Sequence, residues 1–137
     1  MMPVAAVDID AGALATYARN FPEARTFAAD IRTVAVEEIS AAVAKTDGSL
    51  LMLAACAPCQ PFSRANRQKR EGDARADLLG EVVRFVEGLE PHFILIENVP
   101  AIRQQDRPSE GPLHSFLQRI GELGYHSAVE TVQVADY

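Results

Sequence analysis

Short apolar runs alternate with segments of helical periodicity along the chain, and this alternation constrains the fold more than any other feature. Strands are predicted at 4–7, 26–28, 50–54, 93–96 and in the valine- and threonine-rich stretch 128–134. Apolar residues recur at helical spacing within 14–21, 36–43, 78–89 and 113–123. This order favours an α/β fold, a mostly parallel sheet flanked by helices. The continuous apolar runs among the strands are expected to be buried on both faces.

Length and composition limit the class of protein. A chain of 137 residues with 48% apolar and 23% charged residues is typical of one globular domain. No stretch approaches the ~18 apolar residues of a membrane span. The first residues lack the basic region of a signal peptide. We therefore expect a cytoplasmic protein that does not bind membranes.

Polar residues follow four of the predicted strands. Asp8 and Asp10 come after the first, Asp30 after the second, Cys59 after the third and Glu97 after the fourth. Ligands of parallel α/β folds bind outside the carboxyl ends of the strands. The sequence therefore predicts one functional edge that receives residues from all four strands.

Cys59 is a candidate nucleophile. A cysteine attacks as its thiolate, and a neighbouring basic segment favours that form. An inert, buried cysteine is the alternative reading of its position. Cys56 and Cys59 also have the spacing of a thiol redox pair, although the proline at 61 argues for a loop rather than the helix that such motifs open. The three histidines show no paired spacing for a metal site.

Charge is distributed unevenly. The net charge of −6 argues against a nucleic-acid partner, yet residues 64–70 carry four positive charges and no acid. Taken alone, such a run is usually a solvated loop.

The strand-end acids have both structural and chemical readings. Glu97 follows four apolar residues, so we expect partial desolvation, which favours the protonated form of a carboxyl group. Such a group could donate a proton or a hydrogen bond, or it could instead cap a turn or pair with an arginine. Asp8 and Asp30 could accept hydrogen bonds from ribose hydroxyl or adenine amino groups, or could serve as turn or cap residues.

Together these residues resemble the DNA cytosine-5 methyltransferase family. The resemblance rests on Pro-Cys-Gln-Pro-Phe-Ser at 58–63, on Glu-Asn-Val at 97–99, and on the segments Asp-Ile-Asp at 8–10 and Ala-Asp-Ile at 29–31. Gln-Lys at 68–69, Asp-Ala-Arg at 73–75 and Ala-Asp-Tyr at 135–137 also fit. The similarity covers nearly the whole chain and implies a partial Rossmann-like, S-adenosylmethionine-dependent methyltransferase fold.

The resemblance implies covalent catalysis on a cytosine that is flipped out of double-stranded DNA. Cys59 would attack carbon 6 of the ring, and Glu97 would hold or protonate ring nitrogen 3. Carbon 5 would then accept a methyl group from S-adenosylmethionine.

The same resemblance assigns binding residues. Those implied to bind S-adenosylmethionine are Asp8, Ile9, Asp30, Ile31, Pro58 and Leu78. Those implied to contact DNA, mainly its phosphates, are Ser63, Arg64, Arg67, Gln68, Lys69 and Arg75. No metal is implied.

The family pattern extends beyond these residues. A first strand with a glycine-rich turn should precede residue 4, and a target recognition domain and C-terminal segments should follow residue 137. Residues 1–137 are therefore expected to be an incomplete catalytic domain of a bacterial modification enzyme, inactive alone. Two alternatives are one subunit of a split methyltransferase, with a complementary polypeptide, and a non-catalytic remnant. Three residues depart from the family pattern: Ile9 stands where an aromatic residue is common, Asp8 where glutamate is usual and Cys56 where glycine is frequent.

Overall fold

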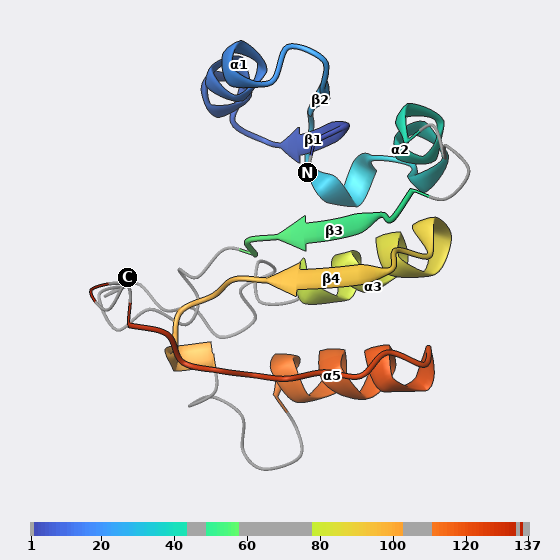
Figure 1. Cartoon of the computed structure of the whole chain (residues 1–137), viewed down its shortest axis with the longest axis vertical. Helices are drawn as coiled ribbons and strands as arrows, with labels where there is room; N and C mark the ends of the chain where they lie inside the picture. The colour runs from blue at the N-terminus through green and yellow to red at the C-terminus, as the bar shows by residue number, and fades with distance from the viewer. Residues whose placement is uncertain (1, 44–48, 58–77, 103–110, 134, 136–137) are drawn as a thin grey trace. The chain divides into compact units, whose positions relative to one another are not determined.

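The computed structural model describes residues 2–43, 49–57, 78–102, 111–133 and 135. Two compact units are present: Met1–Leu51 with Arg84–His92, and Met52–Val83 with Phe93–Tyr137. Each contains one pair of parallel strands (Figure 1). The predicted parallel α/β character is therefore confirmed, but in the described residues the strands form two two-stranded sheets.

The first unit is built on a β-α-β crossover. Strand β1 (Ala5–Asp8) pairs in parallel with β2 (Arg25–Ala28), and α1 (Ala11–Asn20) connects them and contacts both strands. Helix α1 begins after Asp10, whose carboxylate accepts hydrogen bonds from two backbone N–H groups of the first turn. The apolar side of α1 buries Leu14.

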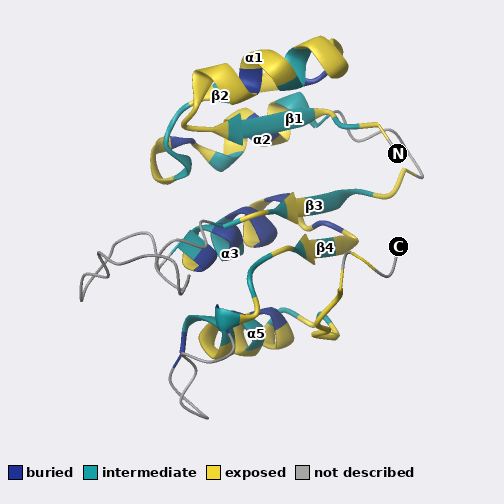
Figure 2. Cartoon of the chain, turned by 90° about the vertical axis from the view of Figure 1, so that its left-hand side faces the viewer, coloured by how far each residue is buried: buried dark blue, intermediate teal, exposed yellow. Residues whose placement is uncertain are grey.

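Two further elements follow β2 in this unit. They are a single 3-10 turn, η1 (Ile31–Thr33), and helix α2 (Val36–Ala42), which buries Ile39. Helix α3 (Leu78–Leu89) contributes its C-terminal half, burying Phe85, Val86 and Leu89 (Figure 2).

Gly88 on α3 allows a close approach to α2. A β-carbon at this position would lie 2.3 Å from Cγ1 of Val36, where no real contact is possible. The missing side chain of glycine is therefore what lets these two helices pack together.

The second unit contains β3 (Met52–Ala55) and β4 (Phe93–Ile96), which pair in parallel with Met52 opposite Phe93. The N-terminal half of α3 buries Leu79 and Val82 here. Helix α5 (Pro112–Glu122) begins with proline at its first position, buries Phe116 and Ile120, and ends before Gly124 at φ 89°.

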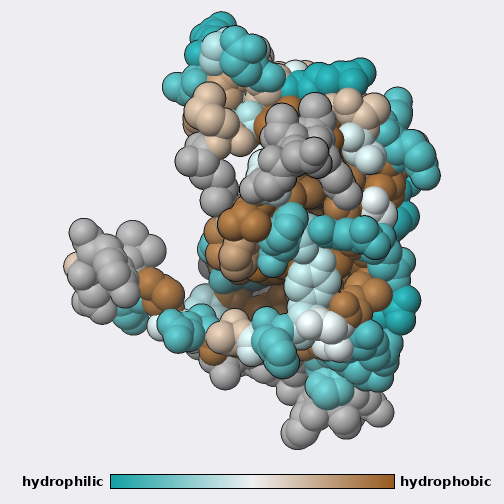
Figure 3. Space-filling model, turned by 45° about the vertical axis from the view of Figure 1, so that its right-hand side comes forward, coloured by the Kyte–Doolittle hydropathy of each residue, from teal (hydrophilic) through white to brown (hydrophobic). Residues whose placement is uncertain are grey.

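The expected burial of β3 and β4 on both faces is wrong. Phe93 and Leu95 are 56% and 55% exposed, whereas Ile94 and Ile96, which point to the other face, are half-buried. In the described part of the chain no element buries the Phe93 side of the strand. Figure 3 shows that apolar residues, in brown, reach the surface on one face of the molecule.

The strand predicted at 128–134 is also wrong for residues 128–133, and residue 134 lies outside the described part. Residues 125–133 carry no strand, and 126–133 are exposed. Valine and threonine favour extended backbone, but a strand also needs a partner for its hydrogen bonds, and none is present among the described residues.

Candidate cofactor and catalytic sites

Asp8 lies at the carboxyl end of β1. One oxygen of its exposed carboxylate accepts a hydrogen bond from the backbone N–H of Asp10 at 2.8 Å. This bond orients the carboxylate beyond the strand, where it can accept from a ligand hydroxyl. Ile9, the next residue, is 74% exposed, so its side chain is available for contact with a ligand ring.

Asp10 has a different role. Its carboxylate accepts from the N–H groups of Gly12 and Ala13 at 2.7 and 3.1 Å and so caps α1. Of the two acids at this strand end, Asp10 therefore has a structural role.

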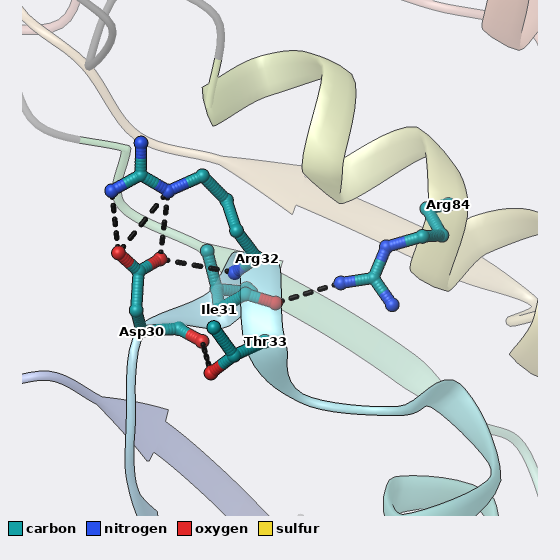
Figure 4. A network of polar contacts seen from close by, with 5 residues as sticks. All are labelled: Asp30, Ile31, Arg32, Thr33 and Arg84. Carbon is teal, nitrogen blue, oxygen red and sulfur yellow. Dashed lines mark hydrogen bonds and ion pairs between the residues drawn. The ribbon is translucent and has the colours of Figure 1, made fainter.

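Asp30 follows β2 and is the N-cap residue of η1. Its carboxylate accepts from the backbone N–H of Arg32 at 3.0 Å and from Nε of the same residue at 2.9 and 3.1 Å, with Nη2 completing a bidentate pair (Figure 4). These bonds, the side-chain one first and the backbone one second, lower the pKa of Asp30 from 3.8 to about 2. Asp30 is thus ionised at neutral pH and is a hydrogen-bond acceptor.

The two acidic strand ends are neighbours in the first unit. Strands β1 and β2 run in parallel with Asp8 opposite Ala28, and the N–H of Ala29 donates to the carbonyl oxygen of Asp8 at 3.0 Å. The prediction that Asp8 and Asp30 share one sheet edge is confirmed. Ile31, half-buried, is the first residue of η1 beside Asp30.

Arg84 was not singled out from the sequence. Its guanidinium, on α3, donates to the carbonyl oxygens of Ile31 at 2.7 Å and Val34 at 2.8 Å. These partners are 53 and 50 positions away, so no local pattern could have indicated them.

The second unit carries its own strand-end constellation. The N–H of Glu97 donates to Ala55 at 3.1 Å, and the side-chain amide of Asn98 donates to the carbonyl oxygen of Ala57 at 3.0 Å. Asn98 also accepts from the N–H of Val99 at 2.9 Å. Ala57 directly precedes Pro58 and Cys59, so Asn98 ties down the chain where the candidate nucleophile's segment begins.

Glu97 itself is exposed, and the partial desolvation expected from the sequence is not seen. The reason is position: Glu97 lies one residue beyond β4, outside the apolar run that precedes it.

Several predicted site residues lie outside the described part of the chain. They are Pro58, Cys59, Ser63, Arg64, Arg67, Gln68, Lys69 and Arg75. Leu78, the remaining predicted cofactor residue, is half-buried at the start of α3. Cys56 is exposed and has a free thiol. That all four strand ends meet at one edge stays a prediction.

The described residues contain neither a candidate metal site nor a membrane-spanning helix. No group of three or more histidine, cysteine, aspartate or glutamate side chains in this part could hold a metal ion. No helix there has the length and apolar character needed to cross a membrane.

Comparison with known proteins identifies the family. Residues 1–137 match the family described as C-5 cytosine-specific DNA methylase. The type II methylase M.HgiDII of Herpetosiphon aurantiacus is 37% identical over 86 residues, which are 63% of this chain and 23% of that protein. The type II methyltransferase M.AgeI of Thalassovita gelatinovora is 33% identical over 130 residues, 95% of this chain and 30% of that protein.

A solved structure agrees. A putative DNA modification methyltransferase encoded within an E. coli prophage superposes with a TM-score of 0.65 at 30% identity, covering 86% of this chain and 31% of that one. The chain belongs to the C-5 cytosine-specific DNA methylase family. It spans about a quarter to a third of the length of the two relatives M.HgiDII and M.AgeI.

Proposed function

We propose that this protein takes part in methylation of carbon 5 of cytosine in double-stranded DNA, with S-adenosylmethionine as methyl donor. The observation that carries the proposal is the family match over the whole chain, together with the pair of acidic strand ends in the first unit. We place the protein in the bacterial cytoplasm, in a modification system like those of its type II relatives.

The acidic edge suits the adenosine part of the cofactor. Asp8, exposed and oriented by a backbone N–H, would accept hydrogen bonds from ribose hydroxyls. Asp30, held ionised by Arg32, would accept from the adenine amino group, since a carboxylate has more lone pairs than one arginine uses. Ile9 and Ile31 would contact the ring, and Pro58 and Leu78 the methionine end.

The chemistry would begin at Cys59. Its thiolate would add to carbon 6 of a flipped cytosine, while Glu97 would donate a hydrogen bond or a proton to ring nitrogen 3 and so neutralise the negative charge that the addition pushes into the ring. S-adenosylmethionine, when bound, would supply the methyl group to carbon 5 and leave as S-adenosylhomocysteine. A base would then remove the proton from carbon 5, the bond between carbon 6 and the sulfur of Cys59 would break to restore the thiolate, and any proton that Glu97 gave to nitrogen 3 would return to it.

The remaining predicted residues would hold DNA. Ser63, Arg64, Arg67, Gln68, Lys69 and Arg75 belong to the segment after the nucleophile, where positive charge would meet phosphates. Phosphate contacts position the duplex without selecting a sequence, so the target site would be selected elsewhere.

Expression of the natural reading frame in a host that lacks cytosine-5 methylation tests the proposal. Bisulfite sequencing should find 5-methylcytosine at one short recurring site. Cys59→Ser should abolish it, whereas Cys56→Ser, the matched control three positions away, should retain it. Methylation that survives Cys59→Ser, or none from the unaltered frame, contradicts the proposal. Equal loss in both variants would show that the effect is not specific to Cys59.

We further propose that residues 1–137 do not turn over DNA alone, because at least two thirds of the length of both M.HgiDII and M.AgeI has no counterpart in them. A complementary polypeptide is the alternative source of that remainder and should then co-purify. Methyl transfer by the purified 137 residues would overturn this.

A further inference from the structure

The 3-10 turn that follows Asp30 and begins at Ile31 accepts hydrogen bonds from a side chain outside it. Arg84, half-buried on α3, donates from Nη2 to the carbonyl oxygen of Ile31 at 2.7 Å and from Nη1 to that of Val34 at 2.8 Å (Figure 4 shows the first bond). The two carbonyls mark the first residue of η1 and the residue that ends it.

The turn η1 makes few hydrogen bonds of its own. Thr33 donates to the carbonyl oxygen of Asp30 from its backbone N–H and from its hydroxyl, both at 2.8 Å, and the N–H of Val34 reaches Ile31 only at 3.4 Å. A three-residue 3-10 turn makes few internal hydrogen bonds and leaves carbonyl groups that need partners. The guanidinium supplies charge-assisted donors to two of them.

We propose that Arg84 is a positioning residue for adenine binding: by holding both ends of η1, it fixes the backbone from which Asp30 and Ile31 meet the ring. The inference rests on the proposed cofactor role of these two residues. Arg84 itself acts through the backbone of the turn and does not contact the cofactor.

Packing is the competing explanation for any effect of removing Arg84. Its guanidinium lies over the ring of Phe85 at 4.6 Å, so a truncation would also remove contact area. Arg84→Met keeps much of the apolar stem and removes every donor. Arg84→Lys keeps a charge and donors but lacks the planar fork that reaches two carbonyls at once.

The test measures S-adenosylmethionine affinity by calorimetry on protein from the natural reading frame, together with amide hydrogen exchange without ligand. Arg84→Met should weaken binding by about tenfold and speed exchange at Thr33 and Val34, since hydrogen bonds to charged groups are among the stronger ones. Arg84→Lys should recover part of both. Arg119→Met, which removes a guanidinium from an exposed pair with Glu122 on α5, is the matched control and should change neither.

The variant Asp30→Ala distinguishes a failure of the proposed function from a failure of the role proposed for Arg84. The proposed function is contradicted if this variant binds S-adenosylmethionine as tightly as the unaltered protein, or if the unaltered protein does not bind it. In that case the amide exchange rates at Thr33 and Val34 still test whether Arg84 holds η1. If Asp30→Ala weakens binding but Arg84→Met does not, the inference about Arg84 is overturned while the proposed function stands. The inference about Arg84 is also overturned if Arg84→Met and Arg84→Lys lose the same affinity for S-adenosylmethionine while amide exchange at the turn is unchanged.

Discussion

Asp30 and Arg32 form a pair whose members are only two positions apart, and the acidity of Asp30 depends on it. The side chain and backbone of Arg32 hold the pKa of Asp30 at about 2 instead of 3.8. Because the folded-state pKa is lowered, the pair stabilises the fold above the ordinary pKa of an aspartate and loses this effect as pH falls from about 4 to about 2. The carboxylate of Asp30 is therefore ionised at every pH well above about 2, neutral pH included.

The first prediction concerns this pair. In Arg32→Met the pKa of Asp30 should rise toward 3.8, held down only by the remaining backbone hydrogen bond. The side-chain carboxyl carbon signal of Asp30, followed by NMR between pH 2 and 6, measures it. Arg19→Met, a change on helix α1, serves as control and should leave the titration as it is. A midpoint unchanged in Arg32→Met would show that Arg32 does not set the acidity of Asp30.

Asn98 illustrates a residue whose role depends on one long-range bond. Its amide reaches the carbonyl oxygen of Ala57, 41 positions away, in a partly buried setting. Asn98→Ala should therefore lower the free energy of unfolding by about 1–3 kcal/mol, since the carbonyl loses its partner. The matched control is Asn20→Ala, which removes an exposed amide–carbonyl bond on α1 and should cost at most about 0.5 kcal/mol. Urea denaturation of both variants measures the difference, and equal losses would contradict the prediction.

At the scale of elements, the approach of α2 to α3 is set by the absence of a side chain at Gly88. Gly88→Ala would place a β-carbon against Val36, and the overlap should destabilise the fold by about 1–3 kcal/mol despite the higher helix propensity of alanine. Adding Val36→Ala should recover most of that loss, because it removes the Cγ1 atom that a β-carbon would meet.

Gly121 on α5 provides the opposite case. A β-carbon there would meet nothing within 4 Å, so Gly121→Ala should stabilise the fold by about 0.5–1 kcal/mol. Thermal denaturation of the two alanine variants should therefore shift the midpoint in opposite directions. A stabilising effect of Gly88→Ala would mean that the two helices do not approach as closely as described.

Elements with a strong local signal could be predicted from the sequence. Strand β4 occupies the predicted 93–96, and α3 occupies the predicted 78–89. Strand β3 begins two residues later than predicted, because apolar composition does not show where the ladder starts. The stretch 128–133 has the composition of a strand but lacks a partner in the described residues, and pairing is not a local property.

In the candidate site, too, features set by local sequence could be predicted and features set by long-range contacts could not. The strand-end positions of Asp8, Asp30 and Glu97 followed from the apolar runs before them, and the parallel pairing of β1 and β2 brought the first two together. The contacts of Arg84 and Asn98 could not be predicted, since each joins segments more than 40 positions apart. The exposure of Glu97 also depends on tertiary structure.

At the scale of the whole molecule, the chain combines an acidic average with a basic segment and an exposed apolar strand face. The net charge is −6, whereas residues 64–70 carry four positive charges. Phe93 and Leu95 remain more than half exposed on β4. The basic segment adjoins Cys59 in sequence, and in the proposed function its positive charge would attract DNA phosphates.

The central claim is that Cys59 attacks a cytosine in DNA, and covalent trapping tests it most directly. Protein from the natural reading frame would be incubated with S-adenosylmethionine and a duplex of mixed sequence containing 5-fluorocytosine, which blocks the last proton removal. Mass spectrometry of the digested adduct should find the nucleotide on Cys59, and none in Cys59→Ser. The adduct should be methylated only when S-adenosylmethionine is present. No adduct, or an adduct on Cys56, would contradict the account.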